Sequence, residues 1–108
     1  MQDKAKLLDL GSKVIDILRQ IYDPEIPVNI YDLGLVYKID IDNDLVAHIE
    51  MTLTAPNCPV AESLPEEVKQ RVTDEVEEIR DTTVEIVFDP PWSKDMISEA
   101  ALLELGLL

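Results

Sequence analysis

Apolar and polar residues alternate with strand character in three stretches of the chain. In residues 45–54 the odd positions from Leu45 to Leu53 are apolar and most of the positions between them are polar, which is typical of a β-strand with one buried face. Residues 35–40 and 83–88 also predict strands. Ile41-Asp42-Asn43-Asp44 tolerates a tight reversal, so residues 35–40 and 45–54 are predicted to form an antiparallel hairpin.

Helical spacing predicts three amphipathic or short helices. The first covers residues 5–21, where Gly11 costs roughly 1 kcal/mol relative to alanine and favours close packing. The second runs to about Ile79, and its start matches a capping box from Ser63 to Glu66. The alternative, that this helix begins earlier with a turn at Cys58, stays open. The third covers residues 98–106 and ends at a glycine.

The predicted order is helix, strand, strand, helix, strand, helix. This order predicts one α/β (α+β) domain over residues 1–108, with a small three-stranded mixed sheet packed in two layers with helices. The order of the strands within the sheet does not follow from the sequence.

The hairpin brings distant residues together. The chain enters the first strand of the hairpin at Gly34 and leaves the second strand at Thr54. In an antiparallel pair these two points lie at the same end. We therefore expect the loop 23–32, which carries Asp23, Glu25 and Asp32, to approach the loop after Thr54. The alternative for these carboxylates is solvated loop charge with local turn hydrogen bonds.

The only cysteine, Cys58, follows the 45–54 strand and precedes the second helix. The positive N-terminus of a helix favours a thiolate, so this position suits thiolate chemistry and we expect an accessible thiol. The alternative is a buried structural cysteine. A site built from metal ligands alone is disfavoured, because the sequence has no C-x-x-C motif and no histidine near Cys58. The only histidine, His48, precedes the end of its strand by about 20 Å of strand rise, so we expect it to be a surface or partly packed residue.

The composition limits the classes of partner that the chain is expected to bind. The chain has 23 acidic and 9 basic residues and a net charge of −14, which disfavours binding to nucleic acid or anionic membranes. A hydrophobic content of 46% is typical of a globular domain. One cysteine and a start without a signal peptide predict a cytoplasmic protein. The small size is compatible with a homodimer.

Five blocks of the sequence resemble a known family. They are Asp23–Val28, Asp32–Tyr37, Thr52–Pro59, Asp89–Trp92 and Ser98–Ala100. In this order they resemble the SufT-like family of iron–sulfur maturation factors, which is related to the PaaD proteins and to the cytosolic iron–sulfur targeting factors of eukaryotes. The resemblance implies a fold like that of iron–sulfur cluster assembly domains, and a non-enzymatic role in building or delivering clusters.

The resemblance also implies site residues. The family's reactive cysteine falls on Cys58, which we expect to be a functional thiol and a transient cluster ligand. The supporting residues are expected to be Glu25, Asp32, Thr52, Thr54 and Asn57. Many relatives have a basic residue where this chain has Leu102. The expected partners are iron–sulfur assembly proteins and apo iron–sulfur clients, and any cluster is expected to be labile rather than tightly bound.

Two other functions stay open from the sequence. A thiol-dependent enzyme would need a base near Cys58, a role that would fall to Glu25 or Asp32 because His48 is far away. A protein-interaction adaptor would use Cys58 only as a structural residue. Replacement of Cys58 by serine separates the adaptor from both thiol-dependent functions.

Overall fold

The computed structural model describes residues 4–23, 26–53 and 63–106. Three helices and three strands follow in the predicted order, together with one short 3-10 helix. The elements are α1 (Lys4–Leu18), β1 (Val36–Ile41), β2 (Val46–Met51), α2 (Ser63–Glu75), β3 (Asp81–Ile86), η1 (Lys94–Met96) and α3 (Glu99–Glu104). The predicted fold class is confirmed.

The three strands form one mixed sheet in the order β1-β2-β3. β1 pairs with β2 antiparallel, with Ile39 opposite Ile49, which confirms the predicted hairpin. β2 pairs with β3 in parallel, so the connection through α2 is a crossover that returns the chain to the same end of the sheet. The register of β1 shifts between Val36 and Lys38, which marks a β-bulge at the start of that strand.

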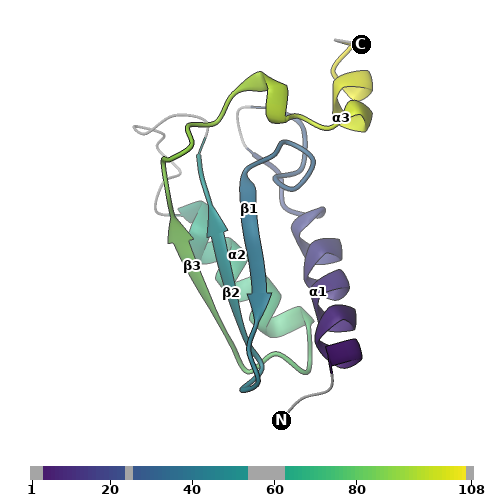
Figure 1. Ribbon diagram of the computed structural model, residues 1–108. Helices are drawn as coiled ribbons and strands as arrows, with labels where there is room; N and C mark the ends of the chain where they lie inside the picture. The colour runs from purple at the N-terminus through teal and green to yellow at the C-terminus, as the bar shows by residue number, and fades with distance from the viewer. Residues whose placement is uncertain (1–3, 24–25, 54–62, 107–108) are drawn as a thin grey trace.

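Helices α1 and α2 lie against one face of the sheet (Figure 1). Along β2 the buried residues are Ala47, Ile49 and Met51, and they alternate with half-buried residues, as a strand with one covered face requires. The core consists of these side chains with apolar residues from both helices, among them Leu10, Val14, Val68 and Val72. The other face of the sheet carries polar side chains.

The helices are shorter than the apolar spacing predicts. Helix α1 ends at Leu18 because the next amides, from Gln20 and Ile21, donate to carbonyls three residues earlier and close tight turns. Helix α2 begins at Ser63 and ends at Glu75, although a further turn with buried Val76 and Ile79 continues the predicted apolar face. Each difference arises at a helix end, where the hydrogen-bond pattern tightens.

The last helix confirms its predicted ends. The Ser98 hydroxyl accepts a hydrogen bond from the amide of Ala101 and caps the N-terminus of α3. Gly106 follows the helix at φ 74°, the left-handed conformation of a C′ glycine. Close packing at Gly11 was a wrong expectation, because a Cβ atom there would meet no other atom within 4 Å. No helix among the described residues is long and apolar enough to cross a membrane.

Candidate functional site

The candidate site lies at the end of the sheet where β1 begins and β2 ends. The amide of Thr52 donates a 2.7 Å hydrogen bond to the carbonyl of Leu35, so the chain that leaves β2 lies beside the chain that enters β1. The amide of Val87, just after β3, donates to the carbonyl of Met51 at 2.9 Å. Three segments far apart in the sequence therefore meet at this end. The hairpin geometry predicts the first two, and the parallel pairing of β2 with β3 adds the third.

The segment between α1 and β1 folds back on itself at the same end. The amide of Ile30 donates to the carbonyl of Ile21 at 2.8 Å, and the amide of Leu35 donates to the carbonyl of Ile30 at 3.1 Å. Asp23 is buried within this segment, and its carboxylate accepts a hydrogen bond from the amide of Ile26. The loop that carries the predicted acidic residues is thus tied to the beginning of β1.

Asp32 takes part in a local network. Its carboxylate accepts a 2.8 Å hydrogen bond from the Asn29 amide group, and its own backbone amide donates to the Asn29 side-chain oxygen at 2.9 Å. The Nε of Arg19 lies 4.0 Å from the same carboxylate and the guanidinium stacks over the Tyr31 ring at 5.0 Å. The local turn hydrogen bonding that the sequence left as an alternative is therefore present. A role for Asp32 in function stays a prediction.

Thr52 has an unusual side chain. It is fully buried, and its hydroxyl has no hydrogen-bond partner among the described residues. Buried polar groups are rarely left unpaired, so each one needs an explanation, such as local strain, a reactive role or a bound water. This hydroxyl lies at the exit of β2, directly before the segment that carries Cys58 in the sequence. A role for Thr52 in the site stays a prediction.

The segment after β3 holds this end of the sheet together. The indole Nε1 of Trp92 donates to the carbonyl of Leu33 at 2.8 Å, and the amide of Ser98 donates to the carbonyl of Asp32 at the same distance. Gly34 has φ 86°, and a Cβ atom on it would overlap the backbone of Met96. The turn that presents Asp32 is therefore fixed by residues some 60 positions later.

Sequence reasoning missed most of these contacts. Only Asn29-x-x-Asp32 carries a local signal, since an asparagine three residues before an aspartate is a common turn pairing. The contacts that Arg19, Trp92 and Ser98 make are tertiary contacts, and no local sequence pattern predicts them. The remaining predicted site residues, Glu25, Thr54, Asn57 and Cys58, lie outside the described part of the chain.

His48 lies on the sheet away from this end, as predicted. Its Nε2 is 2.8 Å from the Asp42 carboxylate and its Nδ1 is 2.8 Å from the Thr83 hydroxyl. The hydrogen bond from His48 and a second from the amide of Val46 hold the pKa of Asp42 below its ordinary value. Histidine and aspartate thus secure the hairpin turn against β3. Within residues 4–23, 26–53 and 63–106, no group of three histidine, cysteine or acidic side chains is arranged to hold a metal ion.

Comparisons with known proteins agree on one family. The sequence profile of the family described as "Iron-sulfur cluster assembly protein" matches residues 12–86. The chain is 46% identical over 103 residues to the "Fe-S protein maturation auxiliary factor" of Porphyromonas gingivalis, which covers 95% of this chain and 97% of that protein. It is 45% identical over 87 residues to the "Fe-S protein maturation auxiliary factor SufT" of Staphylococcus aureus, covering 81% and 98% of the two chains.

Solved structures agree with the fold. A crystal structure of a "Domain of Unknown Function DUF59" from Bacillus anthracis superposes with a TM-score of 0.90 at 34% identity, over 98% of this chain and all of that one. The order of elements that the sequence predicts is therefore the order of a known fold.

Proposed function

Because the chain belongs to the SufT-like family of iron–sulfur cluster assembly proteins, we propose that it is a non-enzymatic accessory factor that helps build clusters or deliver them to apoproteins through the thiolate of Cys58. The observation that carries this proposal is the near full-length similarity to proteins named as iron–sulfur maturation auxiliary factors. These relatives are called auxiliary factors rather than enzymes.

The Thr52 hydroxyl, which has no hydrogen-bond partner within the described part of the chain, supports a role for the end of the sheet in this function. A hydroxyl that is buried without a partner can donate a hydrogen bond to a thiolate or to a cluster sulfide, both of which are acceptors. Asp32 lies in the adjoining turn, held by Asn29 and Ser98. In this proposal Glu25, Thr54 and Asn57 complete the surroundings of Cys58.

The cluster is cargo rather than a resident cofactor. Iron–sulfur clusters are commonly held by four thiolates, and this chain has one cysteine. The missing ligands would come from a second copy of the chain, a small thiol, an assembly protein or a client protein. The net charge of −14 also disfavours retention of an anionic cluster. We place this function in the cytoplasm, where thiols stay reduced.

Deletion of the gene in its own host tests the proposed function. Iron–sulfur enzymes, such as an iron–sulfur dehydratase, should lose activity severalfold while the amount of their polypeptide stays constant, and enzymes without clusters should be unaffected. A plasmid copy of the wild-type gene should restore activity. Normal activity of every iron–sulfur enzyme in the deletion strain, under both low and high iron, would contradict the proposal.

Anaerobic reconstitution tests how the cluster is held. The purified protein should lose its iron on desalting, and any retained iron should elute with an oligomer on size exclusion. A monomer that keeps a stoichiometric cluster would show that the cluster is resident and not cargo.

A further inference from the structure

The strand β3 forms one edge of the sheet and has a free outer side. In the order β1-β2-β3 it pairs only with β2. Among the described elements only β2 and α2 lie against it, and α2 covers one face of the sheet rather than its edge (Figure 1). An edge strand of this kind presents amides and carbonyls that can pair with another strand. We call this outer side the β3 edge.

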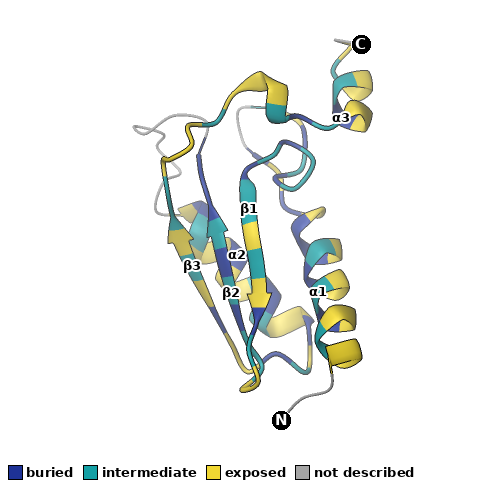
Figure 2. Cartoon of the chain, viewed as in Figure 1, coloured by how far each residue is buried: buried dark blue, intermediate teal, exposed yellow. Residues whose placement is uncertain are grey.

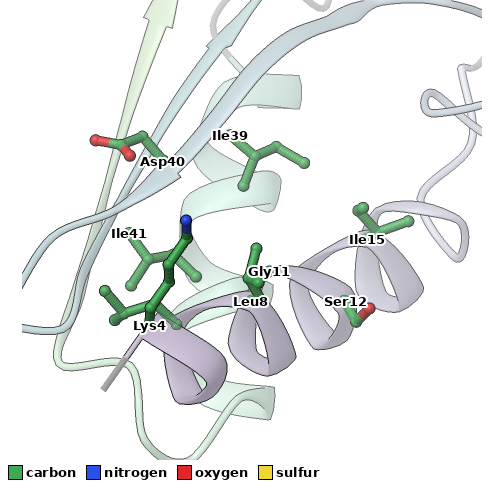
Figure 3. Close-up of a pocket in the computed structure, with 9 residues that line it drawn as sticks. Lys4, Leu8, Gly11, Ser12, Ile15, Ile39, Asp40 and Ile41 are labelled. Atoms are coloured by element: carbon green, nitrogen blue, oxygen red, sulfur yellow. The ribbon is translucent and has the colours of Figure 1, made fainter. Parts of the chain in front are cut away.

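The opposite edge of the sheet is occupied. Helix α1 lies alongside the outer side of β1. A groove of about 350 Å³ separates the two elements, with Leu8 and Ile15 on the helix and Ile39 and Ile41 on the strand (Figure 3). A further strand beside β1 would meet α1, because neighbouring strands lie about 4.8 Å apart. Of the two described edges, the β3 edge is therefore the one that can accept a strand.

Alternate residues of β3 direct their backbone groups to this edge. The amide of Val87 donates to the carbonyl of Met51 on β2 at 2.9 Å. Successive residues of a strand point their backbone groups to opposite sides, so the amides of Thr82, Val84 and Ile86 face outward. In the described part of the chain these amides have no strand to pair with. The β3 edge thus offers regularly spaced hydrogen-bond donors.

The side chains of β3 on the helix side of the sheet are apolar or buried. Thr82 is buried and accepts a 2.8 Å hydrogen bond from the Thr73 hydroxyl of α2, so the even-numbered side chains of β3 point toward the helices. Val84 and Ile86 follow on this side and are only half buried. A strand added beside β3 would cover them further with apolar side chains of its own. The positions of the added strand on this side should therefore be apolar.

On the open face of the sheet the β3 edge is acidic. The exposed side chains of β3 there are Asp81, Thr83 and Glu85, and neither carboxylate forms an ion pair within the described residues. Lys38, on the same face, belongs to the far strand β1 and lies 4.0 Å from Glu50. Opposite charges on directly paired residues stabilise neighbouring strands, so lysine or arginine is favoured opposite Asp81 and Glu85.

Two further cations near β3 leave this selection unchanged. Arg80 precedes the strand, and its amide donates to the carbonyl of Leu45 at 2.9 Å. Lys69 belongs to α2, which covers the other face of the sheet. Within residues 63–106, neither cation forms an ion pair with Asp81 or Glu85. The net charge of −14 also favours a basic partner.

We propose that the β3 edge binds an extended, basic segment of a partner protein as a fourth strand, with apolar residues over Val84 and Ile86 and lysines or arginines beside Asp81 and Glu85. Addition of a strand to a free sheet edge is a recurrent mode of peptide recognition. A second copy of this chain fits less well, because its own β3 would bring the same two carboxylates and a second net charge of −14 to the edge. The proposal does not depend on cluster binding.

A short labelled peptide of alternating valine and lysine is the probe, and fluorescence anisotropy measures its binding to the intact protein. Hydrogen exchange locates the peptide. The amides of Thr82, Val84 and Ile86 should exchange at least about tenfold more slowly when it binds, because they gain a strand partner. The amides of Thr83 and Glu85, which face β2, should change little. A valine–glutamate peptide should bind at least severalfold more weakly.

Two N-methylated forms of the peptide test backbone pairing at constant charge. One form carries N-methyl groups on every valine and the other on every lysine. Only alternate amides of a strand face its neighbour, so one form should bind like the parent peptide and the other should lose binding. Equal affinities of the two forms would show that backbone pairing is not used, and the proposal would be wrong.

Two charge reversals test the selection of a basic strand. Glu85→Lys should weaken the lysine peptide by about fivefold to tenfold and strengthen the glutamate peptide. The matched control is Asp40→Lys, which changes the net charge equally at an exposed carboxylate on the same open face but on β1. It should change the affinity by less than about twofold, because charges two strands away are screened. Equal weakening by both substitutions would mean that the peptide responds only to overall charge, which contradicts the proposal.

The remaining outcomes also decide. Failure of the lysine peptide to bind, or binding without slower exchange at Thr82, Val84 and Ile86, would overturn the proposal. If sedimentation shows that the protein alone is a dimer in which these amides are already protected, the β3 edge is an interface between copies and not a site for a partner segment.

Discussion

The amide of Thr52 and the carbonyl of Leu35 form a 2.7 Å hydrogen bond that joins the exit of β2 to the entrance of β1. This contact extends the hairpin beyond its regular pairs, which end at Val36 and Met51. As a result, the turn that holds Asp32 and the chain that leads to Cys58 start from the same end of the sheet. The proposed site depends on this arrangement.

Replacement of Thr52 by valine should separate stability from function. Valine keeps the shape and removes a buried hydroxyl that has no partner among the described residues, so the free energy of unfolding should rise by about 1 kcal/mol. Activation of iron–sulfur enzymes in the cell should nevertheless fall. Denaturant unfolding and complementation of the deletion strain measure the two effects. Thr52→Ser, which keeps the hydroxyl, is the control, and a valine variant with full activity would remove Thr52 from the site.

Replacement of Gly34 by alanine should destabilise the fold. The residue has φ 86°, and the new Cβ would overlap the backbone of Met96, so we expect a loss of about 3 kcal/mol in the free energy of unfolding. Gly11→Ala is the matched control, since it meets open space within a helix and should gain up to about 1 kcal/mol. Similar effects of the two substitutions on the unfolding midpoint would show that the turn does not pack against η1 as described.

Acid should destabilise the protein through three carboxylates. The pKa values of Asp42, Glu75 and Glu78 are lowered, chiefly by hydrogen bonds from His48, Arg71 and Lys13 respectively. A carboxylate with a lowered pKa stabilises the folded state above its unfolded pKa, and this contribution is lost as pH falls through the folded pKa. Stability should therefore decline below about pH 4.5.

Asp42→Asn tests one of these contributions. The free energy of unfolding should depend less steeply on pH below about 4 than in the wild type, because one carboxylate with a lowered pKa is absent. His48→Gln, which removes the imidazole donor, should change the slope in the same direction but by less, because the amides of Val46 and Asp44 still donate to the carboxylate. Chemical unfolding at several pH values measures it. Unchanged slopes in both variants would mean that the pair at Asp42 and His48 contributes nothing to stability.

The sequence predicts what depends on local pattern. Alternation in residues 45–54 places Ala47 and Ile49 in the core, and the short last helix ends at Gly106, because each of these needs only neighbours in the chain. The contact of Trp92 with Leu33 is different. It joins residues 59 positions apart through a segment without regular structure, and no periodicity in the sequence reports such a pairing.

For the candidate site too, the sequence predicts the features that depend on local pattern and not the tertiary contacts. The predicted hairpin brings the turn at Asp32 and the strand end at Thr52 to one end of the sheet, because strand pairing fixes the ends of strands. It does not reveal that Asn29 and Arg19 contact Asp32, or that the buried hydroxyl of Thr52 finds no partner in the residues that the structure describes. These details depend on side-chain packing, which follows from the tertiary structure.

The activity of iron–sulfur enzymes in a deletion strain that expresses Cys58→Ser tests the central claim most directly. Serine keeps the size and polarity of the side chain but does not provide a thiolate. With equal amounts of the two proteins in the cell, we predict that the serine variant fails to restore the activity that the wild-type chain restores. Full restoration by Cys58→Ser would contradict the account and leave an adaptor in which the cysteine has no chemical role.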